Sequence, residues 1–313
     1  MKKFILKTLA LIIPVVVPAI FMEYMLRQIP NDYSYKKNYL DNHSEEIQIL
    51  ILGASDSYLG VNPVFFPQNT FNVSQVSQSL DLDYKIFTKY HNNFNELKTI
   101  ILSISYSTYW YRMREHQESW RMKSYVIYYG IKSKSWSENS ELLSNDFLIT
   151  VNRLMKYKLR NECDVVCNSL GWGTIYKSEN ADDLYQTGKE AALRHAADIF
   201  SENKVRVYEE NLKIIESFSE FCKQRNINLV FLTTPTYDTY RENIDSKQLE
   251  KMIETTNNFV KNHHHCFYLN YFDNSDFVKN DFFDADHLNE IGTEKLSKKI
   301  VNDLDSLGLL NTI

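Results

Sequence analysis

The sequence predicts an α/β protein built around a doubly wound parallel sheet, with a helical insertion and an N-terminal membrane anchor. Short apolar runs alternate with amphipathic stretches, which is the rhythm of strands and helices in such a sheet. Residues 47–52 are apolar almost throughout, as expected of a central strand that is covered on both faces. Residues 203–225 instead repeat apolar side chains three and four positions apart, which predicts a helix with one buried face.

The other elements follow the same two patterns. We expect strands over residues 70–75, 99–105, 228–234 and 266–270, and further helices over residues 81–92, 246–262 and 290–304. Residues 108–201 show no such alternation and are rich in tyrosine and tryptophan, so we expect a helical insertion that covers the carboxyl edge of the sheet. Its aromatic rings, with Arg112, Arg114 and Arg121, either form the insertion's own core or bind sugars or an acidic polymer.

Residues 1–27 predict a signal-anchor transmembrane helix. Lys2, Lys3 and Lys7 precede an uncharged apolar stretch over residues 8–22. With its flanks this stretch reaches about 23 residues, or roughly 34 Å of helix, which is enough to cross a bilayer. A cleaved signal peptide is the alternative, but no Ala-x-Ala-like site follows. The basic flank stays in the cytoplasm, so we expect a single-pass protein of the cell membrane with its domain outside the cytoplasm.

Composition adds further constraints. Residues 28–46 are polar and predict a tether, which leaves residues 47–313 for the α/β domain. The chain of 313 residues carries a net charge of −5 and shows no basic face, which excludes broad nucleic-acid binding.

The four cysteines contain no Cys-x-x-Cys pair, which argues against a zinc ribbon, and Cys163 and Cys167 are either bridged or free thiols. Residues 263–265 are histidines, but neighbours on a regular element cannot converge on one ion, so we expect no metal and no cofactor.

Three small residues, Gly53, Ala54 and Ser55, end the first predicted strand. They let the backbone turn sharply and leave a hydroxyl at the carboxyl edge of the sheet, where open α/β sheets place ligands. Ser55 is the candidate nucleophile. The alternatives are that it caps a helix, or that nearby Ser57 takes the role. A serine hydroxyl is a weak nucleophile and needs a base within hydrogen-bonding reach.

A second polar block near the C-terminus supplies that base. His287 follows Asp284 by three residues and lies just before the final predicted helix. We expect His287 to act as general base and then as general acid, and Asp284 to orient its imidazole. Asp286 is a rival for the orienting role, although its place directly before the histidine should point it elsewhere.

These two blocks together resemble the SGNH (GDSL-like) hydrolase superfamily. Gly53-Ala-Ser55 stands where that family has Gly-Asp-Ser, and Asp284-Ala-Asp-His287 stands where it has its acid and base. The spelling Gly-x-Ser-x-x-x-x-Gly-x-Asn-Pro, which ends at Pro63, is similar to the membrane-anchored branch associated with cell-surface polysaccharide O-acyl transfer. The resemblance implies a flavodoxin-like three-layer sandwich and a serine–histidine–aspartate mechanism without a cofactor.

The resemblance also implies an oxyanion hole. In the family it is formed by the N–H of the nucleophile, a glycine after the second strand and an asparagine after the third. This chain has serines near the last two places. We therefore expect the N–H groups of Ser55 and Ser74 and the hydroxyl of Ser105 to take these roles.

The function that follows is that of a membrane-anchored, extracytoplasmic acyl esterase or O-acyltransferase that acts on a cell-envelope glycan through an acyl-enzyme. Its expected partners are the glycan or another acyl-ester substrate, the membrane and a membrane-bound acyltransferase, but not nucleic acid. The main alternative is a catalytically silent subunit that binds glycan through the aromatic insertion. A weaker alternative is a lipid or phospholipid acyl hydrolase, which only the nearness of the membrane suggests.

Overall fold

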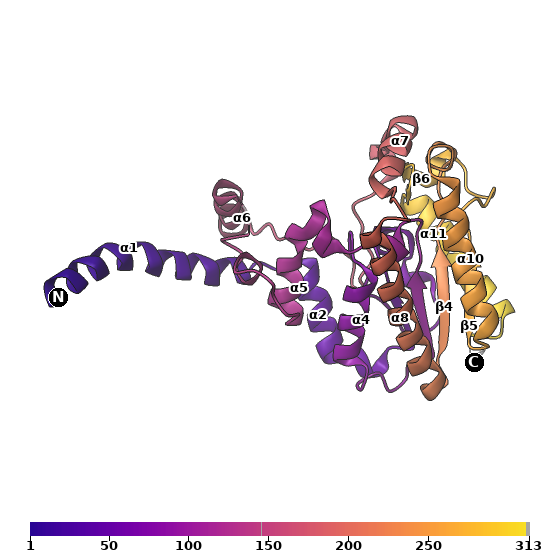
Figure 1. Cartoon of the computed structure of the whole chain (residues 1–313), viewed down its shortest axis with the longest axis horizontal. Helices are drawn as coiled ribbons and strands as arrows, with labels where there is room; N and C mark the ends of the chain where they lie inside the picture. Colours follow the sequence, from indigo (N-terminus) through magenta and orange to yellow (C-terminus); the bar gives the residue numbers. More distant parts are fainter. Residues whose placement is uncertain (145, 311–313) are drawn as a thin grey trace. The chain divides into compact units, whose positions relative to one another are not determined.

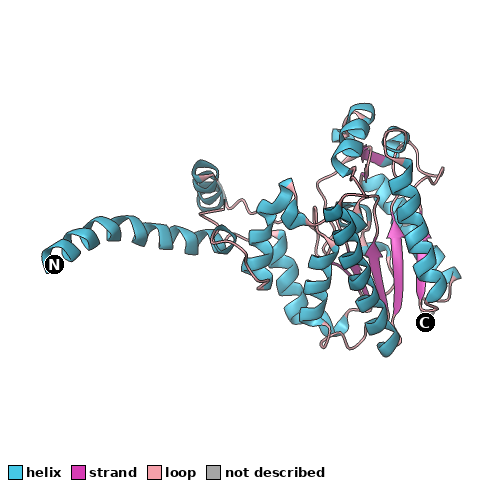
Figure 2. Cartoon of the chain, viewed as in Figure 1, coloured by secondary structure: helices cyan, strands magenta, loops and turns pink. Residues whose placement is uncertain are grey.

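The computed structural model describes residues 1–144 and 146–310, and the chain divides into two compact units (Figures 1 and 2). The α/β unit consists of residues 39–116 and 166 onward. The N-terminal unit consists of residues 1–38 and 117–165 and is built from helices and loops. The sheet and the residues predicted for the active site all belong to the α/β unit.

The α/β unit is organised around a parallel sheet with the strand order β2-β1-β3-β4-β5. Its strands are β1 (Ile49–Leu52), β2 (Thr70–Asn72), β3 (Thr99–Ser103), β4 (Asn228–Thr233) and β5 (Cys266–Asn270). This arrangement confirms the predicted doubly wound parallel sheet, and every strand lies within its predicted range. The order reverses between β1 and β3, and such a switch point is where open α/β sheets hold their ligands.

Helices cover both faces of this sheet. The helices of the α/β unit are α3 (Ser55–Gly60), α4 (Leu80–Tyr90), α7 (Leu184–His195), α8 (Glu202–Arg225), α9 (Asp238–Arg241), α10 (Ser246–Asn262) and α11 (Glu290–Ser306), of which α7 and α9 pack on each other. α8 and α10 lie along β4 and β5 (Figure 1). Alternate strand residues point to opposite faces: Val230 joins the apolar cluster that includes Ile300 of α11, whereas Phe231 packs on Phe259 of α10. Burial on both faces explains why the strands are continuous apolar runs.

Sequence patterns do not predict the short antiparallel hairpin of β6 (Phe282–Asp284) and β7 (His287–Leu288), which directly precedes α11. Neither strand is long enough to show the alternation that identifies a strand. Short 3₁₀ helices join the larger elements at Ser44–Glu46, Pro63–Phe65, Thr108–Trp110, Met113–Glu115, Gln117–Arg121, Ser137–Asn139, Ser178–Asn180 and Lys279–Asp281.

The N-terminal unit contains α1 (Lys2–Arg27), α5 (Met122–Tyr129), α6 (Phe147–Arg160) and the start of α2 (Asp32–His43). By length and composition alone, α1 is sufficient to span a membrane, and none of its most apolar window is buried. Its 26 residues correspond to roughly 39 Å of helix.

The prediction of a polar tether over residues 28–46 is wrong, because most of this stretch is helical and packed. Leu40 of α2 is buried, and Tyr39 stacks on Phe71 with the ring centroids 3.8 Å apart. Lys36 is buried as well, despite its charge. The many polar residues favoured a linker, but the few apolar and aromatic side chains among them decide how the segment packs.

The stretch over residues 108–201 does not form one insertion. Residues 117–165 belong to the N-terminal unit, whereas residues 166–201 pack within the α/β unit. There, Nε1 of Trp172 donates to the carbonyl oxygen of Leu59 at 2.6 Å, and α7 contacts α9 and β6. Neither part shows a regular alternation of strand and helix patterns, so the sequence does not separate them.

Gly53 at the exit of β1 provides a test of how tightly this turn is packed. It has a φ of +139°, and a Cβ at this position would lie 2.4 Å from Cβ of Ser103. We expect Gly53→Ala to lower the free energy of unfolding by at least about 2 kcal/mol, because it combines backbone strain with a clash against β3. Chemical denaturation of the full chain measures this loss.

Gly130→Ala is the matched control. Gly130 also has a positive φ, +72°, but no described atom lies within 4 Å of its Cβ position. This variant therefore reports backbone strain without a clash. Equal losses of stability in the two variants would contradict the close packing inferred at Gly53.

Candidate active site

A buried carboxyl group holds the exit of β1 in one conformation. Oδ1 of Asp83, on α4, accepts hydrogen bonds from the N–H of Gly53 at 2.9 Å and from Nε2 of Gln78 at 2.6 Å. Burial raises the pKa of Asp83 to about 8, although both donors oppose the rise. Because the turn is held in this way, α3 begins at Ser55 and places that residue at the carboxyl edge of the sheet, beside the switch point.

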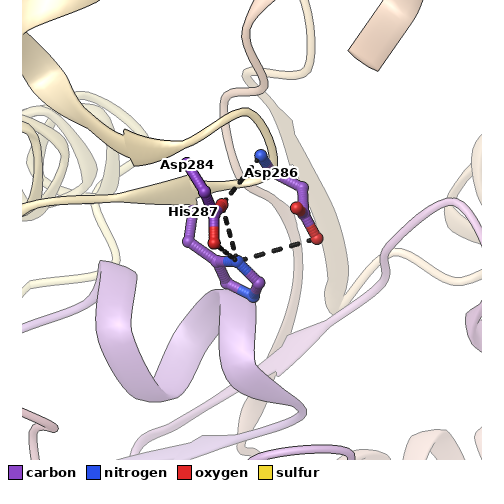
Figure 3. A group of neighbouring side chains, drawn as sticks. All are labelled: Asp284, Asp286 and His287. Atoms are coloured by element: carbon purple, nitrogen blue, oxygen red, sulfur yellow. Dashed lines mark hydrogen bonds and ion pairs between the residues drawn. The ribbon is translucent and has the colours of Figure 1, made fainter. Parts of the chain in front are cut away.

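The β6–β7 hairpin brings the predicted acid and base together. Asp284 and His287 pair across it, and Ala285 and Asp286 form the turn between them. Nδ1 of His287 lies 2.9 Å from Oδ1 and 3.1 Å from Oδ2 of Asp284 (Figure 3). Since directly paired residues of a hairpin present their side chains on the same face, the Asp-x-x-His spacing here delivers both groups to one place.

The second ring nitrogen of the histidine reaches the candidate nucleophile. Nε2 of His287 lies 2.8 Å from Oγ of Ser55, so Ser55, His287 and Asp284 form one hydrogen-bonded line. Helix α11 joins the two halves of this line, because it follows the hairpin directly and Thr293 donates to the carbonyl oxygen of Leu59 in α3 at 2.8 Å. The structure thus brings the three residues predicted to be catalytic into mutual contact.

Asp286 adds a second negative charge but is not the nearer carboxylate. Its Oδ2 lies 3.6 Å from Nδ1 of His287, and its N–H donates to Oδ1 of Asp284 at 3.1 Å (Figure 3). Burial raises the pKa of Asp286 to about 6; His287 opposes the rise and Asp284 adds to it. These distances favour Asp284 over Asp286 as the group that orients the imidazole.

The surroundings favour a charged imidazole at neutral pH. Burial opposes protonation of His287, but Asp284 and Asp286 outweigh it and raise its pKa to about 9. Burial likewise acts against ionisation of Asp284, but the contact with His287 keeps the pKa of this carboxyl group below its usual value. His287 is therefore a strong base, and the charge that it acquires on accepting a proton is compensated where it forms.

Other serines predicted near the site are engaged elsewhere. The hydroxyl of Ser57 is buried and donates to Oγ of Ser74 at 2.8 Å, and the N–H of Ser74 donates to Oδ1 of Asn72 at 3.0 Å. Both groups are therefore engaged with neighbouring side chains, and the oxyanion role of Ser74 and the alternative role of Ser57 as nucleophile stay predictions. The N–H of Ser105 donates to Oγ1 of Thr108 at 2.8 Å, and its hydroxyl lies 2.9 Å from the same atom, so its oxyanion role stays a prediction.

The sequence analysis missed Asp56, which directly follows Ser55. The Asp56 carboxyl group is buried, and the hydroxyl of Ser103 at the end of β3 donates to its Oδ2. Among the described residues, its Oδ1 has no hydrogen-bond partner. Burial raises the pKa of Asp56, whereas Ser103 and His287 lower it. Its place next to the candidate nucleophile is the signal that could have pointed to this residue.

A second histidine, also missed, borders the site from α7. Nδ1 of His195 lies 2.9 Å from the hydroxyl oxygen of Tyr240 and 3.8 Å from Oδ2 of Asp286. The neighbouring Arg194 lies 3.7 Å from the same carboxylate oxygen. Burial and the charge of Arg194 lower the pKa of His195 to about 3, which keeps this ring neutral. Its location in an irregular aromatic stretch offered no sequence pattern that would identify it.

The carboxylate and histidine side chains that could bind a metal ion contact other protein groups. Within residues 1–144 and 146–310, the cluster with ligand atoms close enough to share an ion consists of Asp284, Asp286 and His287, which lie within 4.8 Å of one another. In this cluster Nδ1 of His287 is already taken by Asp284. The ring of His263 stacks on Phe259. Within the described residues, no disulfide joins Cys163 and Cys167.

Comparison with known proteins adds little to this picture. No protein-family model matches the chain, and no curated protein does. Among solved structures, it is similar to the crystal structure of a "putative acylhydrolase" from Bacteroides fragilis NCTC 9343, with a TM-score of 0.38 and 9% identity over 87% of this chain and 94% of that one. A likeness at this TM-score does not support an assignment of function, so the role of the site is inferred from the geometry of its own residues.

The charge balance around His287 can be tested by titration. In the full chain with isotope-labelled histidine, we expect NMR to give a His287 titration midpoint of about 9, and a lower midpoint in Asp284→Asn. A raised pKa in the folded state means that the protonated ring stabilises the fold. This stabilisation should be complete below the unfolded-state value of about 6.5 and should disappear as the pH rises through 9.

Asp305→Asn serves as the control, because Asp305 is an exposed residue near the far end of α11 and its loss removes the same charge. It should leave the midpoint unchanged. A wild-type midpoint near the ordinary histidine value would overturn the electrostatic account of the site.

Proposed function

We propose that this protein is a membrane-anchored ester hydrolase or O-acyltransferase of the SGNH type, acting outside the cytoplasmic membrane on acyl esters of a cell-envelope glycan. The observation that carries the proposal is the hydrogen-bonded line from Oγ of Ser55 through the imidazole of His287 to the carboxylate of Asp284. Nucleophile, base and orienting acid in contact are the elements that acyl transfer through a serine requires.

In the proposed reaction, Oγ of Ser55 attacks the carbonyl carbon of the ester while Nε2 of His287 takes the hydroxyl proton. Asp284 stabilises the imidazolium that forms. The negative oxygen of the tetrahedral intermediate is held by the N–H of Ser55, which opens α3 and therefore has no acceptor within the helix. When the intermediate collapses, His287 returns the proton to the leaving alcohol, and an acyl-serine remains.

The second half of the reaction reverses these roles. His287 takes a proton from an incoming water molecule or sugar hydroxyl, whose oxygen attacks the acyl-serine. The acyl group leaves on that oxygen, and the proton returns to Oγ of Ser55. Hydrolysis and transfer share every step up to this acceptor, so the triad geometry supports both equally.

Two sequence features support the cellular setting. The apolar helix α1 carries Lys2, Lys3 and Lys7 at its N-terminal end, which agrees with an anchor that leaves the α/β unit outside the cytoplasm. The spelling from Gly53 to Pro63 resembles proteins of surface-polysaccharide O-acylation, which favours a glycan ester over a lipid. A silent glycan-binding subunit is disfavoured, because binding alone does not require an imidazole held between a hydroxyl and a carboxylate.

Labelling with a fluorophosphonate probe tests the nucleophile. We expect the full chain to be labelled at Ser55 and labelling to be lost in Ser55→Ala. His287→Gln should slow it at least about 10³-fold, and Asp284→Asn about 10²–10⁴-fold. Mass spectrometry of the labelled peptide and the time course of labelling supply both measurements.

Ser57→Ala is the matched control, because it removes the neighbouring hydroxyl, which is buried and bonded to Ser74. It should retain labelling at close to the wild-type rate. An unlabelled but folded wild-type protein would instead support the silent glycan-binding subunit.

The pKa of His287 predicts how the labelling rate depends on pH. With a value of about 9, roughly one imidazole in a hundred is neutral at pH 7, and only the neutral ring accepts the serine proton. The rate should therefore rise about tenfold per pH unit from pH 7 and level off above pH 9. A rate that is flat over this range would refute His287 as the base in the free enzyme.

A further inference from the structure

Helix α6 carries an apolar stripe that nothing in its own unit covers. Leu148, Met155 and Leu159 are 75%, 52% and 76% exposed. They are spaced seven and four residues apart, so they lie along one line of an α-helix of 3.6 residues per turn. An exposed line of large apolar side chains on a helix of 14 residues is unusual in water and marks an interaction surface.

The opposite face of α6 is fixed in place, so the helix cannot roll to hide this stripe. Thr150 is buried, and Nη1 of Arg153 lies 2.9 Å from Oε2 of Glu141. Glu141 is itself buried and binds Nζ of Lys123 at 2.9 Å. Because the Glu141 carboxylate is buried between a buried lysine and a partly buried arginine, this contact is costly to break.

Further contacts attach the segment that precedes α6 to the end of α1. Glu23 in the last turns of α1 accepts hydrogen bonds from the hydroxyl of Ser140 at 2.7 Å and from the N–H groups of Glu141 at 3.1 Å and Leu142 at 3.0 Å. Arg27 at the end of α1 donates to the carbonyl oxygen of Asn139 at 2.5 Å. Figure 1 shows α6 beside this end of α1, and the two helices are in contact.

Basic residues flank the stripe on both sides. At 3.6 residues per turn, Lys158 lies to one side of it, and Lys156 and Arg160 lie to the other. All three are exposed. Long cationic side chains beside an apolar stripe are typical of helices that lie in a membrane interface, where the stems cover apolar surface and the charges meet headgroups.

We propose that α6 lies on the outer surface of the bilayer that α1 crosses, with the stripe in the acyl boundary and the basic residues on anionic phospholipid headgroups. The proposal depends on the membrane anchoring included in the proposed function. The bilayer is the partner that the contacts favour, because α6 is bound to the end of α1 at which that helix leaves the membrane. A surface helix of this kind fixes the tilt of the N-terminal unit, which a lone transmembrane helix leaves open.

Site-directed fluorescence in vesicles tests this proposal. The full chain, with Cys163→Ser and Cys167→Ser to remove the accessible thiols, receives an NBD label at Leu159→Cys or, as a matched control, at Arg160→Cys. The two positions are adjacent in sequence but about 100° apart around the helix. The vesicles contain phosphatidylcholine and phosphatidylglycerol, with or without spin-labelled lipid, and flotation checks insertion of α1.

We expect a blue-shifted emission and quenching by spin-labelled lipid that is about twofold or more stronger at position 159 than at position 160. Chains that float with the vesicles but show equal, weak quenching at both positions would overturn the membrane contact of α6 while leaving the anchor intact. A blue shift at position 159 without lipid quenching would also overturn it and indicate a protein partner. Chains that do not float would refute the anchor and this proposal together, whereas fluorophosphonate labelling of Ser55 would be unaffected.

Discussion

The hydrogen bond between Nε2 of His287 and Oγ of Ser55 joins two parts of the chain that are 232 residues apart. Packing within the α/β unit holds both parts in the positions that this contact requires. One end depends on the turn after β1, which Asp83 holds. The other depends on the β6–β7 hairpin, which is packed against α11 so closely that a Cβ at Gly292 would lie 2.9 Å from a side-chain carbon of Leu288 in β7. Because α11 also bonds to α3, neither end can move independently of the other.

Charge explains why this contact is both costly and useful. Two carboxyl groups and one imidazole are buried together, and the pKa of His287 rises to about 9 because the carboxylates outweigh the burial. The ring is then protonated in the resting state at neutral pH, which stabilises the fold but withholds the base. Under the proposed mechanism, the neutral ring that acts as the base becomes more abundant as the pH rises towards 9.

The N-terminal unit contains α1 and none of the candidate catalytic residues. Its contacts converge on the end of α1, where Glu23 and Arg27 bind the segment that leads to α6. A stretch that looks like one aromatic insertion in the sequence is thus divided between two tasks. Residues 117–165 belong to the same unit as α1, and residues 166–201 bring His195 and Arg194 to the border of the candidate active site.

The sequence by itself determined the strands, the principal helices and the identity of Ser55, Asp284 and His287 as candidates, because hydrophobic period and short motifs are local properties. It did not reveal His195 or Tyr240, which approach the site only through tertiary packing and carry no local pattern. Asp56 is next to Ser55 in the sequence, but only folding brings the hydroxyl of Ser103 to its buried carboxyl group. The same limit explains the error over residues 28–46, where burial of Leu40 and Tyr39 outweighs a polar composition. Which hydrogen bonds a polar group makes is decided by neighbours distant in sequence, and only the tertiary structure supplies them.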